Sequence, residues 1–246
     1  MPDDALIVVT KLVKRFGPKV VLRGLDFSVQ QGEFVALLGP NGAGKTTFLR
    51  ILSSLSSPTM GRVSVAGHEL PRQASAVRLR LGVVSHLPLL YGDLTAEENL
   101  RFYGRMYGVL NAAKRIEEVL NLVGLLPRRR DLVRTFSRGM QQRLAIGRAI
   151  IHDPEVLLLD EPHTGLDQDA CEMLDSVLGQ VAARGRTVVM TSHDLTRVED
   201  MASRFDVLTR GSIQASIRKE DLPRDGQLAY YRRSLDAAKF VQEAAG

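Results

Sequence analysis

A glycine-rich stretch near the start of the chain has the residue types and spacing of a phosphate-binding loop. Residues 39–46 read GPNGAGKT and fill every fixed position of the pattern G-x-x-x-x-G-K-[ST]. Glycines let the backbone turn several N–H groups toward one anion, and a following helix start adds about half a positive charge. Lys45 can reach the outer phosphates, and the Thr46 hydroxyl can ligate Mg²⁺. The loop predicts a site for a nucleoside triphosphate with Mg²⁺.

Two acidic residues, Asp160 and Glu161, end the apolar run VLLLDEP. Parallel sheets bind ligands beyond the carboxyl ends of their strands, so we expect both carboxylates near the loop. Successive side chains of a strand point to opposite sides, which favours different roles for the two. We assign Asp160 to Mg²⁺, directly or through water, and Glu161 to the general base that polarises the attacking water. A solvated strand end is the simpler alternative.

A histidine and a second helix start complete the candidate chemistry. His193 follows the apolar run VVMTSHD, which places it at the same sheet edge, where it can sense the γ-phosphate. A lone histidine is more often structural, and only this position favours a functional role. In TFSRGMQQRLAIGRA (135–149), the hydroxyl of Ser137 and the amide of Gly139 at a helix start can clamp an anion. Their separation from the first loop lets them act across an interface.

The elements that position these residues follow from apolar patterning. Short β-branched runs at 5–9 and 20–29 predict a small antiparallel sheet. Near-continuous apolar runs of strand length then alternate with helical periods, which predicts an α/β fold with a doubly wound, mainly parallel sheet. Those runs are 33–39, 81–85, 156–160, 186–192 and 205–209.

The chain is predicted to be a single domain over 1–246. Residues 5–93 and 152–218 would form the nucleotide-binding core. Helical periods between 94 and 151 predict an inserted helical subdomain, since the interval is too long for one crossover. Loose helical spacing over 219–246 predicts a peripheral C-terminal helix.

Composition limits the class of protein but does not identify a binding partner. The 246 residues are 44% hydrophobic and carry a formal net charge of +5, which suits an anionic partner or simply solubility. The single cysteine, Cys171, cannot form an internal disulfide and indicates a packed thiol in a reducing compartment. No signal-peptide pattern and no run of about eighteen apolar residues occurs, so we expect neither secretion nor a membrane span.

Together these motifs resemble the ATP-binding cassette ATPases, the P-loop NTPases that power ABC transporters. The family's landmarks occur in order from Phe16 to the strand near Val207. They are an aromatic residue for adenine stacking (Phe16), the phosphate loop (39–47), a loop around His86, the signature (136–140), the strand 156–161, a TGLD turn (164–167) and a switch histidine (His193). Taken together, these motifs identify the family with high specificity. Each one alone, apart from the phosphate loop, would be a weak signal.

The resemblance implies a head-to-tail dimer in which each signature serves the partner's ATP. It also implies a second ATPase subunit, a homodimer being favoured, and an integral membrane subunit that holds the chain on the cytoplasmic side of the cell membrane. The implied catalytic residues are Lys45, Glu161 and His193, with Thr46 and Asp160 for Mg²⁺. The implied ATP contacts are Phe16, Gly39, Pro40, Asn41, Gly42, Ala43, Gly44, Lys45, Thr46, Thr47, His86, Ser137 and Gly139.

This sequence departs from the family pattern at two places. The usual signature is Leu-Ser-Gly-Gly-Gln, and Phe136, Arg138 and Met140 replace three of its residues. Arg138 would either add a charge to the clamp or point to solvent. His86 stands where the family has a glutamine, and an imidazole suits Mg²⁺ poorly because that ion prefers oxygen ligands.

The transported molecule is less well defined. The segment 85–109 with FSRGMQQRLAIGRA is most similar to the haem-exporter ATPases of cytochrome c maturation, and somewhat less to exporters of drugs, lipids or polysaccharides. A remote alternative is an ABC ATPase that acts on DNA or ribosomes. No basic and aromatic stacking pattern accompanies the charge, so we expect no nucleic-acid partner.

Overall fold

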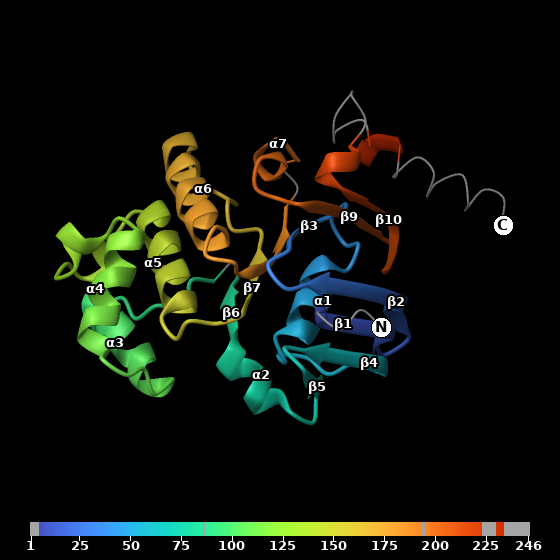
Figure 1. Cartoon of the computed structure of the whole chain (residues 1–246), viewed down its shortest axis with the longest axis horizontal. Helices are drawn as coiled ribbons and strands as arrows, with labels where there is room; N and C mark the ends of the chain where they lie inside the picture. The colour runs from blue at the N-terminus through green and yellow to red at the C-terminus, as the bar shows by residue number, and fades with distance from the viewer. Residues whose placement is uncertain (1–4, 86, 193–194, 223–229, 234–246) are drawn as a thin grey trace.

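The computed structural model describes residues 5–85, 87–192, 195–222 and 230–233 of the chain. The smaller of its two sheets is antiparallel, with the strand order β2-β1-β4-β5 (Figure 1). Its strands are β1 (Ala5–Phe16), β2 (Lys19–Gln30), β4 (Met60–Val65) and β5 (His68–Leu70). The sequence predicts the first pair but not the second, because a strand as short as β5 shows no readable alternation.

The larger sheet has the order β10-β9-β3-β8-β7-β6 and is parallel except at its β9–β10 edge. Every residue of β3, β7 and β8 is buried, as expected for strands covered on both faces. The predicted doubly wound α/β fold is therefore confirmed, with β10 as an additional edge strand. The strands are β3 (Phe34–Leu38), β6 (Leu81–Val84), β7 (Val156–Asp160), β8 (Thr187–Thr191), β9 (Arg204–Thr209) and β10 (Ser212–Arg218).

Helix α1 (Lys45–Leu52) follows the glycine-rich loop and packs between the two sheets. Its Phe48 is fully buried and meets the ring of Phe27 of β2 edge-on, with 5.1 Å between ring centroids. Val35 and Leu37 of β3 belong to the same apolar cluster. Both flanks of the loop are thus held by rigid elements, which is what a precise phosphate site requires.

The opposite face of the larger sheet is covered by α6 (Gln168–Ala182) and α7 (Leu195–Glu199). Leu174 of α6 and Val198 of α7 pack with Phe34 and Ala36 of β3. Consecutive residues of β3 therefore face different cores, which is the period of two of a strand.

The helices predicted between 94 and 151 lie together at the end of the molecule opposite the small sheet (Figure 1). Thr95 and Glu98 form a reciprocal capping box at the first of them, so the sequence marks its start. A short helix, α2 (Ala74–Arg80), precedes β6 and was not expected. The three helices are α3 (Ala96–Met106), α4 (Ala112–Leu122) and α5 (Arg138–Ile150).

The C-terminal helix predicted over 219–246 does not begin at residue 219. A 3₁₀ turn occupies Lys219–Asp221, and the Lys219 amide donates to Ser203 O, which ties the turn to the core. Residues 230–233 are helical, and the remainder of the predicted helix lies outside the described residues. Within the described ranges, no helix combines the length and the apolar character needed to cross a bilayer.

A partly buried histidine joins two helices of the helical region. His152 follows α5, and its ring stacks on Tyr107 at the end of α3 with centroids 3.8 Å apart. Burial lowers the pKa of His152 from 6.5 to about 4. The folded protein therefore resists protonation at a pH where the unfolded chain accepts the proton.

This shift predicts a pH dependence of stability. The contribution of His152 to the free energy of unfolding should be at its maximum above pH 6.5. It should decrease as the pH falls to about 4, where the folded chain also binds the proton. After discounting for partial exposure, the loss should be about 2 kcal/mol. His152→Phe keeps the stack and removes the titration, so urea unfolding at several pH values should show a flatter profile. The same pH dependence in both proteins would contradict the prediction.

Candidate functional site

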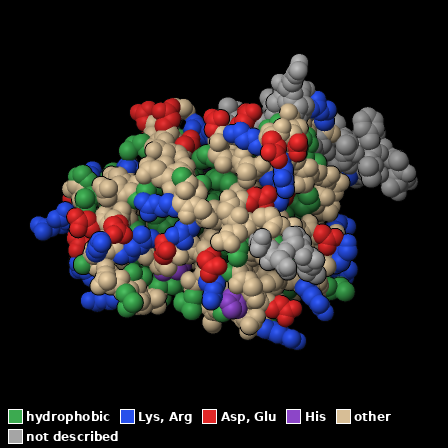
Figure 2. Space-filling model, in the orientation of Figure 1, with side chains coloured by type: hydrophobic (Ala, Val, Ile, Leu, Met, Phe, Trp, Pro, Cys, Tyr) green, Lys and Arg blue, Asp and Glu red, His purple; other side chains and the backbone are tan. Residues whose placement is uncertain are grey.

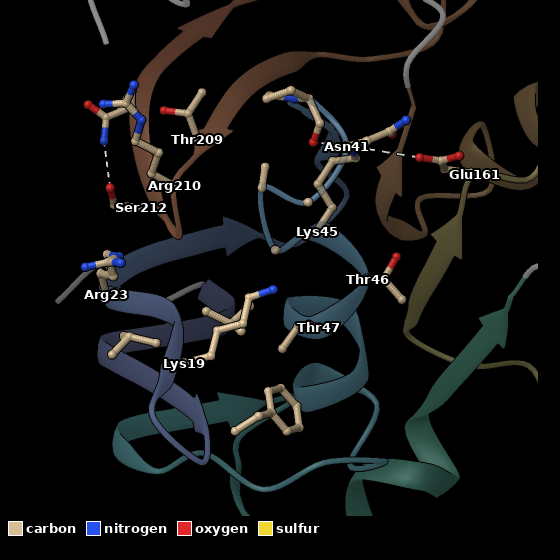
Figure 3. Close-up of a pocket in the computed structure, with 18 residues that line it drawn as sticks. Lys19, Arg23, Asn41, Lys45, Thr46, Thr47, Glu161, Thr209, Arg210 and Ser212 are labelled. Atoms are coloured by element: carbon tan, nitrogen blue, oxygen red, sulfur yellow. Dashed lines mark hydrogen bonds and ion pairs between the residues drawn. The ribbon is translucent and has the colours of Figure 1, made fainter. Parts of the chain in front are cut away.

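A cavity of about 970 Å³ lies over the glycine-rich loop (Figure 3). Its lining brings together residues that are far apart in the sequence. The start of β2, the loop, the end of β7 and the β9–β10 turn all contribute. The lining residues named by the sequence analysis are Phe16, Pro40, Asn41, Gly42, Ala43, Gly44, Lys45, Thr46, Thr47 and Glu161.

Two glycines of the loop cannot be replaced without strain. A Cβ on Gly39 would lie 2.1 Å from Leu208 O of β9, and its φ of +153° is one that side chains rarely adopt. Gly44, at φ +112°, is the N-cap of α1, and a Cβ there would meet the side chain of Leu22 at 2.9 Å. The loop therefore runs close against β2 and β9, and its backbone is held for an anion at the helix start.

Lys45 is the buried cation of the site. Only 5% of its surface is exposed, its Nζ donates to Gly39 O at 2.7 Å, and Nζ lies 3.8 Å from a Glu161 carboxylate oxygen. Burial lowers the pKa of Lys45, while the negative charges of Glu161 and Asp160 oppose that shift. Figure 3 shows Lys45 and Glu161 directed toward each other across the cavity. The ammonium is thus oriented toward the space where phosphate oxygens would lie.

Asp160 and Thr46 face each other below the loop. The Thr46 hydroxyl donates to Asp160 Oδ1 at 3.3 Å, and the Thr191 hydroxyl of β8 donates to the same oxygen at 2.8 Å. Asp160 is 8% exposed. A hydroxyl and a carboxylate are hard oxygen donors, which suit Mg²⁺, an ion that commonly keeps water and phosphate oxygens as its other ligands. The donor set fits that ion.

Glu161 does not continue the alternation of β7. The strand ends at Asp160, and Glu161 has φ +48°, so both carboxylates lie on the loop side of the sheet. The expectation that alternation separates the two side chains is therefore wrong. The Glu161 amide donates to the Thr191 hydroxyl at 2.9 Å, and the Thr164 hydroxyl donates to Glu161 Oε2 at 3.2 Å. These bonds hold the carboxylate at the cavity wall.

Phe16 ends β1 and lines the same cavity. Its ring is 54% exposed, and Lys14 Nζ lies 4.7 Å from the ring centroid. An ordinary core aromatic would be buried, so this exposure agrees with a stacking platform.

Ser137 and Gly139 lie elsewhere, at the start of α5, and do not belong to the described lining of the cavity. Ser137 is the N-cap of α5, and its hydroxyl accepts from the Met140 amide at 3.3 Å. Gly139 is buried, and a Cβ there would lie 2.6 Å from the Cβ of Ala170. The helix start is therefore packed closely against α6.

Two residues that depart from the usual signature, Phe136 and Arg138, make contacts within the chain. Phe136 is buried, with the guanidinium of Arg128 5.7 Å from its ring centroid. The guanidinium of Arg138 lies against Gly165, since a Cβ on that glycine would meet it at 2.3 to 2.8 Å. Arg138 is exposed and does not join the described lining of this cavity, and its guanidinium contacts the TGLD turn of its own chain. His86 and His193 lie outside the described residues.

Several polar side chains of the cavity were not expected. Lys19 and Arg23 come from β2, and Arg210 and Gln214 come from the β9–β10 hairpin. They belong to no local motif, and only the packing of the hairpin on β2 brings them to the loop. Gly211 in the hairpin turn allows this packing, since a Cβ there would lie 2.2 Å from Val21 O of β2.

The sheet topology and the loop at the carboxyl end of β3 define a P-loop nucleotide-binding protein. The model of the family described as ABC transporter matches residues 22–164. Since that is more than half of its length, the chain belongs to the ATP-binding proteins of ABC transporters, and it is an ABC ATPase.

Curated relatives agree with this assignment. The chain is 39% identical over 211 residues to the linearmycin resistance ATP-binding protein LnrL of Bacillus subtilis, covering 85% of this chain and 68% of the relative. It is 40% identical over 222 residues to the daunorubicin resistance ATP-binding protein DrrA3 of Streptomyces coeruleorubidus, covering 89% and 70%. It is 37% identical over 220 residues to the Nod factor export ATP-binding protein I of Cupriavidus pinatubonensis, covering 89% and 68%.

Solved structures give the same result. An ATP-binding subunit of an ABC transporter superposes with a TM-score of 0.84 at 29% identity, covering 94% of this chain and 99% of that one. The dimeric cassette MJ0796, in a post-hydrolysis state with ADP and Pi, gives 0.77 at 27% identity, covering 87% and 98%. The three relatives described above are named for resistance or Nod factor export, and the haem-export prediction gains no support from them.

The exposed ring of Phe16 leads to a prediction. Phe16→Ala should weaken ATP binding by about 1–3 kcal/mol, or roughly 5- to 150-fold, because a base loses its stacking partner. Titration calorimetry with ATP measures this, with unfolding curves as a check on the fold. Leu55→Ala, at a residue 64% exposed and outside the lining of this cavity, is the matched control. Unchanged affinity in folded Phe16→Ala would contradict the prediction.

Proposed function

We propose that this chain is the ATP-hydrolysing subunit of an exporter and that it hydrolyses ATP at the interface of a head-to-tail dimer. The observation that carries the proposal is the division of the site. The cavity joins the phosphate loop, Phe16 and Glu161, whereas Ser137 and Gly139 lie at a separate helix start. An anion clamp so placed is available to a nucleotide held by another copy.

The residues of the cavity have distinct roles in this proposal. The amides of residues 39–47 and the ammonium of Lys45 bind the phosphates, and Phe16 stacks on the adenine. Thr46 and Asp160 would hold Mg²⁺, which when bound supplies charge neutralisation between phosphate oxygens. Glu161 orients the attacking water and accepts its proton. The buried lysine next to Glu161 keeps the carboxylate aimed at the cavity.

The signature residues and the two histidines complete the site across the dimer. Ser137 and Gly139 would bind the γ-phosphate held by the partner copy, and binding energy spent this way favours the closed dimer. His193 is proposed to contact the γ-phosphate of its own chain. For His86, we propose a hydrogen bond to the lytic water rather than Mg²⁺ ligation, because Mg²⁺ prefers oxygen ligands.

An exposed apolar surface supports a membrane subunit as partner. Tyr91 and Phe102 contact each other at 5.0 Å between centroids, and Tyr103 OH donates to Leu89 O beside them. Met106 lies one helical turn beyond Phe102. Exposed apolar groups gathered in this way mark interaction sites. They are Leu87, Leu89, Tyr91, Phe102, Met106 and Leu110, with exposures from 38% to 87%. A partner that spans the membrane would hold the chain on its cytoplasmic side.

For the exported molecule, we favour the class of drugs, lipids or polysaccharides over haem. The support is that the relatives carry names of antibiotic resistance and Nod factor export. Figure 2 shows basic and acidic side chains interspersed on the face in view, which gives a nucleic-acid partner no support there. We further propose that 5–93 with 152–218 act as the core, that 94–151 act as the subdomain contacting the membrane partner, and that 219–246 are peripheral.

Mixing two inactive variants tests the dimer. Lys45→Ala removes the phosphate ligand of its own chain, and Ser137→Ala removes the clamp offered to the partner. Their heterodimer keeps one intact composite site, so ATPase activity should rise above that of either variant alone. The control pairs Lys45→Ala with Lys45→Ala/Ser137→Ala, which leaves no intact loop. No increase in the first mixture would overturn the trans arrangement.

Recovery from membranes tests the partner surface. Met106→Glu places a charge on a side chain that is 67% exposed, so the fold and ATP binding should persist while recovery with an integral membrane protein falls several-fold. Leu55→Glu, on a residue 64% exposed elsewhere, should be recovered as the unmodified chain is. Equal recovery of both variants, or recovery with DNA or ribosomes alone, would contradict the proposal.

A further inference from the structure

Three polar side chains behind the nucleotide cavity connect the turn after β7 to both helices that cover the sheet. His163 Nε2 lies 2.6 Å from Asp175 Oδ1 of α6, and Arg197 Nη1 of α7 lies 3.4 Å from Asp175 Oδ2. The side chains of His163, Asp175 and Arg197 are 9%, 27% and 19% exposed. A partly buried carboxylate thus receives one donor from the turn and one from α7.

His163 lies on the same short turn as Glu161. The Thr164 amide donates to Glu161 O at 3.1 Å, and the Leu166 amide donates to His163 O at 3.2 Å. Because consecutive bonds lock this turn, a displacement of His163 displaces the backbone of Glu161. Glu161 itself has φ +48°, a conformation that a non-glycine residue keeps only where its surroundings hold it.

Two independent anchors hold this strained turn. On one side, the Thr191 hydroxyl of β8 accepts the amide of Glu161 at 2.9 Å. On the other side, Asp175 binds His163, and Arg197 fixes Asp175. Arg197 also hydrogen bonds Gln168, the first residue of α6, so it holds that helix at two points. The second anchor thereby spans the turn, α6 and α7.

The surroundings of the two ring nitrogens of His163 indicate which of them donates. Nε2 faces a carboxylate, whereas Nδ1 is buried without a hydrogen-bond partner in the described structure. Nε2–H therefore donates to Asp175, and a side chain with one donor at that place can substitute for histidine. Removal of the donor leaves a partly buried carboxylate with only Arg197 as its charged partner, which costs more than the loss of a fully exposed bond.

We propose that His163 is a positioning residue for Glu161 and that Asp175 and Arg197 form its anchor. This inference rests on the proposed role of Glu161 as general base. The anchor sets the direction of the carboxylate and leaves the phosphate loop unaffected, since the described lining of the nucleotide cavity includes none of the three residues.

His163→Leu should lower kcat about 10-fold, a typical size for a displaced catalytic group, and should change ATP affinity less than about 2-fold. His163→Gln supplies an amide donor to Asp175 and should recover most of the turnover. Single-turnover rates and ATP titrations separate the two quantities. Asp26→Asn, which weakens the Lys11–Asp26 pair between β1 and β2, is the ion-pair control and should change neither, because neither residue lines the nucleotide cavity.

The Glu161→Gln background distinguishes this proposal from its premise. Glu161→Gln alone should bind ATP and lose about 10²-fold in turnover, and near-normal hydrolysis there would overturn the general-base assignment. Adding His163→Leu should lower the residual rate no further. An equal 10-fold loss in that background would overturn the positioning role, since the effect would not pass through Glu161. Wild-type kcat in His163→Leu, or no recovery by His163→Gln, would also overturn it.

Discussion

A buried ammonium ion at the end of a parallel strand is the constraint on which this site depends. Taking a lysine cation out of water is costly unless oxygens surround it, and Lys45 is 5% exposed. Backbone oxygens of the loop accept hydrogen bonds from its ammonium group, and the carboxylates of Asp160 and Glu161 offset part of the effect of burial on its pKa. Strands β3 and β7 therefore end at the same edge of one sheet, with β8 between them. Lys45 thus has oxygen partners before any nucleotide binds, and its ammonium group still faces the cavity where a phosphate would lie.

Thr191 of the intervening strand connects the two carboxylates. Its hydroxyl donates to Asp160 and accepts the amide of Glu161, so one side chain orients the residue assigned to Mg²⁺ and the residue assigned to water. Glu161 can reach the cavity only because the chain leaves the strand after Asp160 in a left-handed conformation. Strain of that kind persists where neighbouring groups hold it, and the His163–Asp175–Arg197 group is placed to do so. In the proposed mechanism, β8 and the helices α6 and α7 therefore share the positioning of Glu161.

The helical region carries the signature residues Ser137 and Gly139, which the described lining of the nucleotide cavity does not include. Ser137 caps α5, and Gly139 is packed against Ala170 so closely that no side chain fits. Arg138 lies on Gly165 of the turn that follows Glu161, so the departures from the family signature also affect contacts within the chain. A capped helix start that lies outside the lining of its own chain's nucleotide cavity is suited to an anion held by a second copy, and this is the physical basis of the proposed dimer.

The sequence by itself determined the elements and residues whose signals are local. Continuous apolar runs identified the buried strands, the capping box at Thr95 marked a helix start, and the fixed positions of the loop identified Lys45 and Thr46. Short elements such as β5 and α2 carry too few residues for a period to emerge, and their pairing supplies the stability that their sequences lack. Only the tertiary structure decided the direction of Glu161, the contact of Arg138 with Gly165, and the arrival of Arg23 and Arg210 at the cavity. Each depends on contacts between segments distant in sequence, which local patterns do not encode.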